Sequence, residues 1–336
     1  MEIPSNPNFK EKYIKYKSKY KNLKNPQKSI VELINRVEIN FNSELESMRS
    51  MICLDDKDPT FVQLKTTFDK CIRRIKENNQ QGKINPFVKI VTNSENQELK
   101  DIYQGGGNSN DNRLMKIGYF PTAADPLHYA HLLTAFEILA ESELDKIVFI
   151  VGGEDKRKPN LTPYAIRKPM ALRALNIFKD FFAFSDIANL GNNFQNDGEL
   201  NMFLDLKRNI NKKITASYIV GSDHFNYTIE KDGVEQDDTL KKLSDNVNKF
   251  ASELPNHTIN AIFIARNEGE ITDEKLKIAR EQIKNRYPIN VIVPSLSFSS
   301  TALRDGFAMK YLIMIPTVTF DDVKQNKLYG TKCFLE

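Results

Sequence analysis

Tryptophan is absent from this chain of 336 residues, and cysteine occurs only three times. Cys53, Cys71 and Cys333 form no CxxC pair, so neither a disulfide framework nor a zinc site is indicated. No run approaches the roughly 20 apolar residues that span a bilayer, and the first residues lack the apolar core of a signal peptide. We therefore expect an intracellular, cytoplasmic protein with no membrane partner.

A basic surface of the size that nucleic-acid binding requires is also missing. The net charge is +4, but residues 1–24 alone carry seven lysines and two glutamates, a net of +5. The remaining 312 residues therefore carry a net charge of −1. Because general nucleic-acid binders spread basic side chains over a whole face, we expect no specific nucleic-acid partner.

The first residues have the pattern of a short amphipathic helix. Aromatic and apolar side chains recur at spacings of three and four along residues 8–24, which places them on one seam, with lysines on the other faces. We interpret this helix as docking on its own protein, with an RNA- or membrane-binding arm as the alternative. Its lysine- and tyrosine-rich composition resembles that of leader segments in many giant DNA virus proteins.

Residues 1–104 as a whole are predicted to form a mainly helical domain. Two longer amphipathic helices are predicted, each starting at an N-cap residue followed by proline: Asn25-Pro26 and Asp58-Pro59. A short β-like run follows at residues 87–91. Three glycines and several small polar residues then predict a flexible linker over residues 105–113, so that a second domain covers residues 114–336.

In this second domain, short strands alternate with helices. Runs rich in isoleucine, valine and phenylalanine predict strands at residues 115–119, 146–151, 183–188, 216–220, 260–265 and 290–293. Helix-like stretches lie between them, including residues 132–140, 168–178, 240–254 and 273–284. Such alternation predicts an α/β, Rossmann-like, doubly wound fold, in which helices cover both faces of a parallel sheet and ligands bind at the carboxyl ends of the strands.

The first predicted strand leads into a segment that holds two of the four histidines of the chain. In DPLHYAHL, residues 125–132, His128 and His131 lie one helical turn apart if the helix begins at residue 125 or 126. Free N–H groups, the helix dipole and two imidazoles at that position favour a phosphate. Histidines that only pack at the start of a helix are the structural alternative. A zinc site is disfavoured, because its usual helical spacing is four residues.

Other segments carry residue types that suit a bound nucleotide. Gly221 and Asp223 follow the fourth predicted strand, where glycine permits close approach of a ligand and a carboxylate can hold ribose hydroxyls. Ser299 or Ser300 can cap a helix that carries Arg304 one turn later, which makes an anion trap. A basic loop follows the second strand, with Lys156, Arg157 and Lys158. A tight turn, an ordinary capped helix and a solvated loop are the corresponding structural alternatives.

Taken in order, these segments resemble the motifs of the HxGH nucleotidyltransferase superfamily, and within it those of the nicotinate/nicotinamide-mononucleotide adenylyltransferases. DPLHYAHL resembles the DPxHxGHL pattern with Ala130 in place of the glycine, and FSSTALR, residues 298–304, resembles ISSTxIR. RKPM, residues 167–170, resembles RxxM, and IPTVTFDDV with KLY resembles the closing helix. The RTxGIST motif of cytidylyltransferases is absent. The resemblance covers about residues 115–330 and leaves residues 1–114 outside.

The resemblance implies a magnesium-dependent transfer of the adenylyl group of ATP to nicotinamide or nicotinic acid mononucleotide, with release of pyrophosphate. Mg²⁺ is implied as a companion of the ATP phosphates, without a protein ligand. The residues implied to stabilise charge are His128, His131 and Arg304. The implied ATP contacts are Gly118, Tyr119, Phe120, Gly221, Asp223, Ser299, Ser300 and Thr301. The implied mononucleotide contacts are Lys156, Arg157, Lys158, Arg167 and Phe225, where Phe225 or Tyr227 replaces the tryptophan of the family in stacking on the pyridine ring.

Two other functions are compatible with the sequence. One keeps the chemistry and changes the acceptor, for example to phosphopantetheine or another phosphometabolite. The other is a non-catalytic nucleotide-binding module that serves an assembly through residues 1–114; the presence of His128, His131 and Arg304 together disfavours it. The sequence leaves open the preference between the amide and the acid mononucleotide, and also the oligomeric state, including a homo-oligomer.

Overall fold

The computed structural model describes residues 26–88, 90, 114–153, 160–189, 198–222, 230–231, 234–235, 239–250, 252–265, 270–282, 288–296, 298, 300–305 and 309–329. The leader helix predicted at residues 8–24 and the linker predicted at residues 105–113 lie outside these ranges. Outside them also lie six predicted site residues: Lys156, Arg157, Lys158, Asp223, Phe225 and Ser299.

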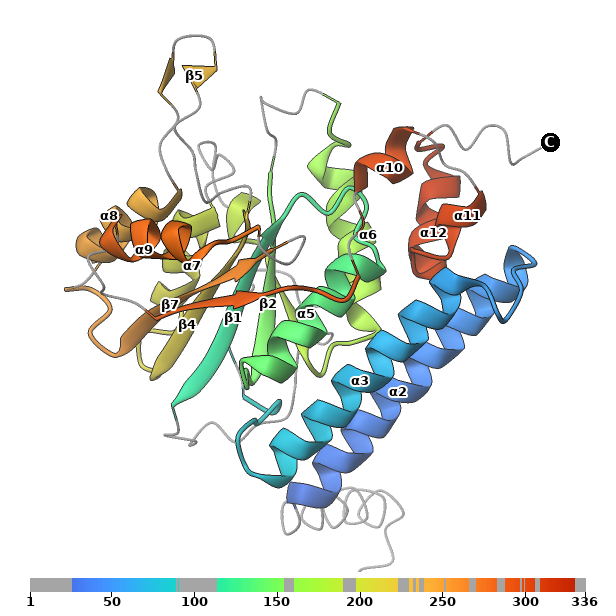
Figure 1. The fold of residues 1–336 in the computed structure, drawn as a ribbon, viewed down its shortest axis with the longest axis horizontal. Helices are drawn as coiled ribbons and strands as arrows, with labels where there is room; N and C mark the ends of the chain where they lie inside the picture. Colours follow the sequence, from blue (N-terminus) through green and yellow to red (C-terminus); the bar gives the residue numbers. More distant parts are fainter. Residues whose placement is uncertain are drawn as a thin grey trace, which may run out of the picture.

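A parallel sheet forms the centre of the molecule (Figure 1). Its six strands are β1 (Met115–Thr122), β2 (Lys146–Val151), β3 (Phe182–Ser185), β4 (Ile214–Gly221), β7 (His257–Ile264) and β8 (Ile289–Ile292). The order is β3-β2-β1-β4-β7-β8, and each neighbouring pair is parallel. The chain winds outward from β1 on one side and from β4 on the other, so a topological switch point lies between these two strands. The predicted strands and the Rossmann-like class are confirmed. Two short antiparallel strands, β5 (Glu230–Lys231) and β6 (Val234–Glu235), pair with each other outside this sheet.

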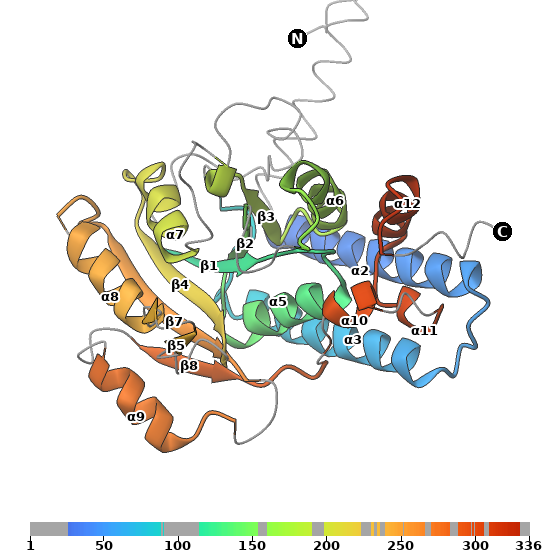
Figure 2. The ribbon, with the colours of Figure 1, turned by 90° about the horizontal axis from the view of Figure 1, so that it is seen from above.

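Helices cover both faces of the sheet (Figure 2). On one face, α5 (Tyr129–Glu141), α6 (Tyr164–Asn176) and α12 (Thr317–Gln325) share a hydrophobic core with Phe120, Phe149 and Ile219. On the other, α7 (Gly198–Lys207), α8 (Thr239–Phe250) and α9 (Asp273–Gln282) share a core with Tyr119 and Val148. Successive strand residues face opposite sides, which is why Tyr119 and Phe120 belong to different cores. Among the described helices, none is long and apolar enough to cross a bilayer.

The β-like run predicted at residues 87–91 is not a strand at the positions that the structure describes. The N–H of Asn85 donates to Oδ1 of Asp145 at 2.6 Å, and the N–H of Phe87 donates to Oδ1 of Asn85 at 3.1 Å. The N–H of Val88 donates to the carbonyl of Asn85 at 3.3 Å, so the first donors of the run bond locally to Asn85 and not to a neighbouring strand. Val88 is buried in the core of α7 and α8, so the apolar pattern of the run reflects packing.

Helices α2 (Pro26–Met51) and α3 (Pro59–Gln80) form a hairpin that packs on α5 (Figures 1 and 2). The predicted start of α3 is confirmed, because the Asp58 carboxylate accepts the N–H groups of Thr60 at 2.8 Å and Phe61 at 3.2 Å. At the centre of the hairpin, Phe41 stacks on Phe68 with 3.8 Å between ring centroids, and Phe68 meets the edge of Phe136 in α5 at 5.5 Å.

This hairpin shares one hydrophobic core with the α/β layer, so it has no core of its own. Polar contacts join it to the same layer: Nδ2 of Asn78 donates to the carbonyl of Ala140 at 2.6 Å, and Arg36 pairs with Asp180 at 2.7 Å. The sequence predicted a separate helical domain over residues 1–104. The shared core corrects that picture for residues 26–80, while the boundary at the predicted linker stays a prediction.

We expect Phe68→Ala to destabilise the whole protein, because the lost ring leaves a cavity between Phe41 and Phe136. Large-to-small changes of this kind cost about 3–5 kcal/mol. Chemical denaturation followed by fluorescence and by circular dichroism measures the loss, and both probes should report one transition. Val62→Ala is the matched control on the same helix, since Val62 is 45% exposed. Two separate transitions, with only the first one shifted, would contradict a shared core.

Candidate functional site

His128 and His131 lie at the carboxyl end of β1, beside the switch point of the sheet. His128 is the N-cap residue of α5 and His131 is in the first turn of that helix, with 3.9 Å between the two ring centroids. The predicted helix start at residue 125 or 126 is wrong by three or four residues. The N–H of Tyr129, the first residue of α5, donates to the carbonyl of Met314 at 2.7 Å. This bond ties the start of α5 to the segment that precedes α12.

Both imidazoles are held neutral and partly without hydrogen bonds. His128 is 1% exposed, and neither of its ring nitrogens has a hydrogen-bond partner; Nδ1 of the partly exposed His131 also has none. Burial, with smaller contributions from His131 and Arg304, lowers the pKa of His128 well below its ordinary value, and burial lowers the pKa of His131 to about 4. Buried polar atoms are rarely left unpaired, so this pair is suited to donating N–H groups to a ligand.

Arg304 brings a fixed positive charge to the same place. It lies on the short helix α10 (Ser300–Asp305), and its Nη1 donates to the carbonyl oxygen of Asp125 at 3.0 Å. The hydroxyl of Ser300 donates to the carbonyl of Pro126 at 3.4 Å. The segments around residues 125–132 and 300–304, which the sequence singled out separately, therefore meet at one point. Their meeting places a guanidinium beside two imidazoles.

Aromatic rings border the two histidines. Phe120 lies 5.2 Å from Phe149 and 6.5 Å from His131, measured between ring centroids. Phe298, just before α10, presents its ring at 87° to His128 with centroids 5.3 Å apart. These rings limit the access of water to the imidazoles, and electrostatic interactions are stronger where water is excluded.

Asp125 holds the loop that carries His128. Its side chain is fully buried, its Oδ2 accepts the N–H of Thr162 at 3.0 Å and lies 3.9 Å from Nη1 of Arg304, and its Oδ1 accepts the hydroxyl proton of Tyr329. Burial and the negative charge of Asp125 raise the pKa of Tyr329, so that hydroxyl stays protonated and donates. Sequence reasoning took Asp125 and Tyr329 only as parts of motifs. Their link joins positions 204 residues apart, which no local pattern reveals.

Arg167 holds together two loops next to the site. Its side chain is fully buried and donates to backbone carbonyls at four positions: Thr162 at 2.5 Å, Ala123 at 2.5 Å, Gly152 at 2.9 Å and Gly153 at 2.8 Å. Instead of the predicted contact with a mononucleotide, the guanidinium connects the loops that follow β1 and β2. A role in shaping these two loops explains a fully buried cation at this position.

The predicted ATP contacts within β1 lie at different depths. A Cβ atom on Gly118 would lie 2.8 Å from Leu144 Cδ1 and 2.9 Å from Ile219 Cδ1, so packing inside the strand requires glycine there. Tyr119 is fully buried on the opposite face, where burial and the nearby Asp205 raise its pKa. The contacts of both residues with ATP stay predictions: Gly118 lies on the sheet face that packs against α5, and Tyr119 points away from the histidines. Phe120 does face them.

The remaining described candidates lie at element ends. Gly221 ends β4, the strand next to β1, and Ser300 and Thr301 begin α10. Their contacts with ATP stay predictions, as do those of the candidates outside the described ranges. In the part of the chain that the structure describes, no group of three or more histidine, cysteine, aspartate or glutamate side chains is placed to hold a metal ion.

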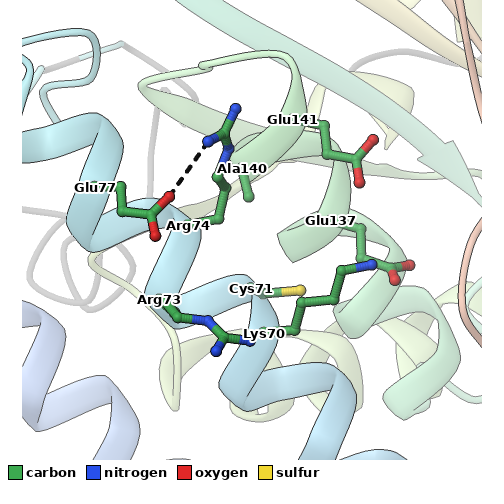
Figure 3. Close-up of a pocket in the computed structure, with 8 residues that line it drawn as sticks. All are labelled: Lys70, Cys71, Arg73, Arg74, Glu77, Glu137, Ala140 and Glu141. Atoms are coloured by element: carbon green, nitrogen blue, oxygen red, sulfur yellow. Dashed lines mark hydrogen bonds and ion pairs between the residues drawn. The ribbon is translucent and has the colours of Figure 1, made fainter.

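A pocket of about 370 Å³ lies away from the histidines, between α3 and α5 (Figure 3). Its lining residues are Lys70, Cys71, Arg73, Arg74, Glu77, Glu137, Ala140 and Glu141. Glu137 lies six residues beyond His131 on α5, which is about 9 Å along a helix axis. The pocket therefore borders the middle and end of the helix whose beginning carries the imidazoles.

The parallel, doubly wound sheet with these residues at its switch point places the protein in the class of Rossmann-like α/β folds. No protein-family model matches the chain. Among curated proteins, it is 29% identical over 210 residues to a probable nicotinate-nucleotide adenylyltransferase of Thermoanaerobacter, covering 60% of this chain and 89% of the relative. It is 23% identical over 223 residues to one of Clostridium botulinum, covering 64% and 98%.

A similar solved structure is that of the nicotinic acid mononucleotide adenylyltransferase of Plasmodium falciparum complexed with NaAD. The match has a TM-score of 0.46 and 17% sequence identity, and it covers 65% of this chain and 99% of that one. The curated relatives confirm the family resemblance that the motifs predicted, since they are named as nicotinate-nucleotide adenylyltransferases.

We expect His131 to make the protein less stable in acid. Its pKa is about 4 in the folded chain against about 6.5 when unfolded. Between these values the unfolded chain binds the proton and the folded chain does not, so the free energy of unfolding falls as the pH decreases from about 6.5 to about 4. His131→Gln removes this loss, by up to about 3 kcal/mol at the acid end.

Urea denaturation of both proteins between pH 7.5 and 4.5 measures the effect. Titrating groups that do not contact His131 are common to both proteins and cancel in the difference, whereas His128, whose pKa His131 helps to lower, does not. Parallel curves over the whole range would contradict the low pKa of His131.

Proposed function

We propose that this protein transfers the adenylyl group of ATP to nicotinic acid or nicotinamide mononucleotide, forming the dinucleotide and pyrophosphate. The observation that carries the proposal is the meeting of His128, His131 and Arg304 at the switch point of the sheet, with imidazole nitrogens that have no partner. The names of the curated relatives support the same reaction and favour the acid form of the acceptor.

In the proposed reaction, a phosphate oxygen of the mononucleotide attacks the α-phosphorus of ATP in line. The bond from the α-phosphorus to the bridging oxygen breaks, and pyrophosphate leaves with that oxygen. His128 and His131 donate N–H groups to the oxygens of the α-phosphate, where negative charge increases in the transition state. The positive end of the α5 dipole acts in the same direction.

Arg304 stabilises the departing pyrophosphate. A guanidinium has five N–H donors, so the bond from Nη1 to Asp125 that anchors Arg304 is compatible with contacts to phosphate oxygens by its other donors. Ser300, at the start of α10, adds a hydroxyl on the same side. Without ligand, the charge of Arg304 disfavours protonation of His128; a bound triphosphate offsets that charge and raises the pKa of both histidines.

We propose that Mg²⁺ enters together with ATP. The described residues fit an ion held by phosphates and water, because Asp125, the buried carboxylate at the site, already accepts bonds from Thr162 and Tyr329. When bound, the ion offsets charge on the phosphates. For the mononucleotide, we propose the loop of Lys156, Arg157 and Lys158 near its phosphate and Phe225 or Tyr227 near its ring. A homo-oligomer stays a prediction.

A panel of acceptors tests the reaction. The protein is incubated with ATP, Mg²⁺ and either nicotinic acid mononucleotide, nicotinamide mononucleotide or phosphopantetheine, and pyrophosphate release is followed. We expect release with a pyridine mononucleotide at a rate at least about 100-fold above that with phosphopantetheine, because a site that fits one acceptor discriminates strongly against another. Release with phosphopantetheine alone would refute the assigned acceptor. ATP binding without release from any acceptor would favour a non-catalytic module.

We expect His128→Ala to lower turnover at least about 100-fold with little loss of stability, on the scale of removing one preorganised donor. His257→Gln is the matched control. His257 is another partly buried histidine, but it starts β7 at the amino end of the sheet, opposite the site. His257→Gln should leave turnover within about twofold of the wild-type value. Near-normal turnover of His128→Ala would remove this imidazole from the mechanism.

A further inference from the structure

Glu137 connects the helix of the two histidines to the segment that leads into α10. Both oxygens of its carboxylate accept the backbone N–H of Ser295, each at 3.1 Å. Glu137 is only 5% exposed. Ser295 lies between the end of β8 and the start of α10, five residues before Ser300 and nine before Arg304. A buried carboxylate thus holds the chain just ahead of the proposed phosphate-binding helix.

A second side chain holds the same residue from the other side. Nε2 of Gln63, on α3, donates to the carbonyl oxygen of Ser295 at 2.9 Å. The N–H and the carbonyl of Ser295 are therefore both bound by side chains, one from α5 and one from the N-terminal hairpin. The next residue, Leu296, is 7% exposed and belongs to the core that contains α3 and α5. This part of the chain is fixed by polar and apolar contacts together.

The surroundings of Glu137 favour this arrangement. Burial raises the pKa of Glu137, while hydrogen bonding by the side chain and the N–H of Ser295 and the nearby charge of Lys70 act against that rise. Figure 3 shows Lys70 extending from α3 toward the Glu137 carboxylate across the pocket. Glu141, one turn further along α5, lines the same pocket but is exposed. Of these two acidic residues, Glu137 is the one that reaches the segment before α10.

We propose that Glu137, assisted by Gln63, is a positioning residue for the ATP phosphates. It fixes the segment before α10 so that Arg304 and Ser300 lie opposite His128 and His131. One rigid helix, α5, carries the imidazoles at its start and Glu137 two turns later, so it sets the distance between the two halves of the site. Through Gln63, the hairpin that lies outside the family resemblance contributes to the same site.

The proposal rests on the proposed function, but its test measures ATP binding and needs no turnover. Titration calorimetry with Mg²⁺ and a non-hydrolysable ATP analogue gives the affinity of each variant. We expect Glu137→Ala to weaken binding about 10-fold, because α10 loses its anchor. Glu137→Gln should recover most of the affinity, since its carbonyl oxygen still accepts the N–H of Ser295. Glu141→Ala, the matched control, should change it less than twofold.

A double-mutant cycle distinguishes positioning from a general loss of stability. If Glu137 acts through Arg304, Glu137→Ala should weaken binding less than twofold in an Arg304→Ala background. Affinity for the mononucleotide should stay unchanged in every variant. Should Glu137→Ala fail to fold, Gln63→Ala, which removes only an exposed hydrogen bond, is expected to weaken ATP binding about twofold to threefold and serves in the same cycle.

Unchanged ATP affinity of a folded Glu137→Ala protein, or the same loss with and without Arg304, would overturn the proposal. A wild-type protein that binds ATP but transfers its adenylyl group to none of the acceptors would instead refute the proposed function. In that case the binding measurements still decide whether Glu137 positions the phosphate site.

Discussion

The hydrogen bond from Arg304 to the backbone of Asp125 joins two segments 179 residues apart, and the proposed site depends on it. It brings the guanidinium of Arg304 to the loop that carries His128, beside two imidazoles that burial keeps neutral. A neutral pair tolerates a neighbouring guanidinium, whereas two imidazolium ions would repel it. Contacts within the protein itself therefore hold the guanidinium near the imidazoles, and such preorganisation is the condition for strong electrostatic stabilisation of a transition state.

Several buried polar groups keep this arrangement rigid. Arg167 donates to backbone carbonyls of the loops after β1 and β2, Asp125 joins the loop after β1 to Tyr329 near the end of the described chain, and Glu137 holds Ser295 before α10. In each case a charged side chain binds backbone or hydroxyl groups of a distant segment and has its charge satisfied there. The N-terminal hairpin shares the core behind these contacts and takes part in one of them through Gln63.

The sequence predicted what local patterns determine. Buried parallel strands consist of apolar runs, and Asp58 before Pro59 is a local helix start, so both were found. Helix α7 was missed because two of its buried positions are the polar residues Asn201 and Asp205, which interrupt the apolar spacing that predicts a helix. The later start of α5, the scaffold role of Arg167 and the link from Glu137 to Ser295 depend on partners far away in the sequence, such as Met314 for Tyr129. No periodicity encodes such partners.

The most direct measurement of the central claim is a crystal structure of the protein with Mg²⁺ and a non-hydrolysable ATP analogue. We expect oxygens of the α-phosphate within about 3 Å of ring nitrogens of His128 and His131, with the β- and γ-phosphates beside Arg304. An analogue bound elsewhere, for example in the pocket between α3 and α5, with the imidazoles and the guanidinium untouched, would contradict it.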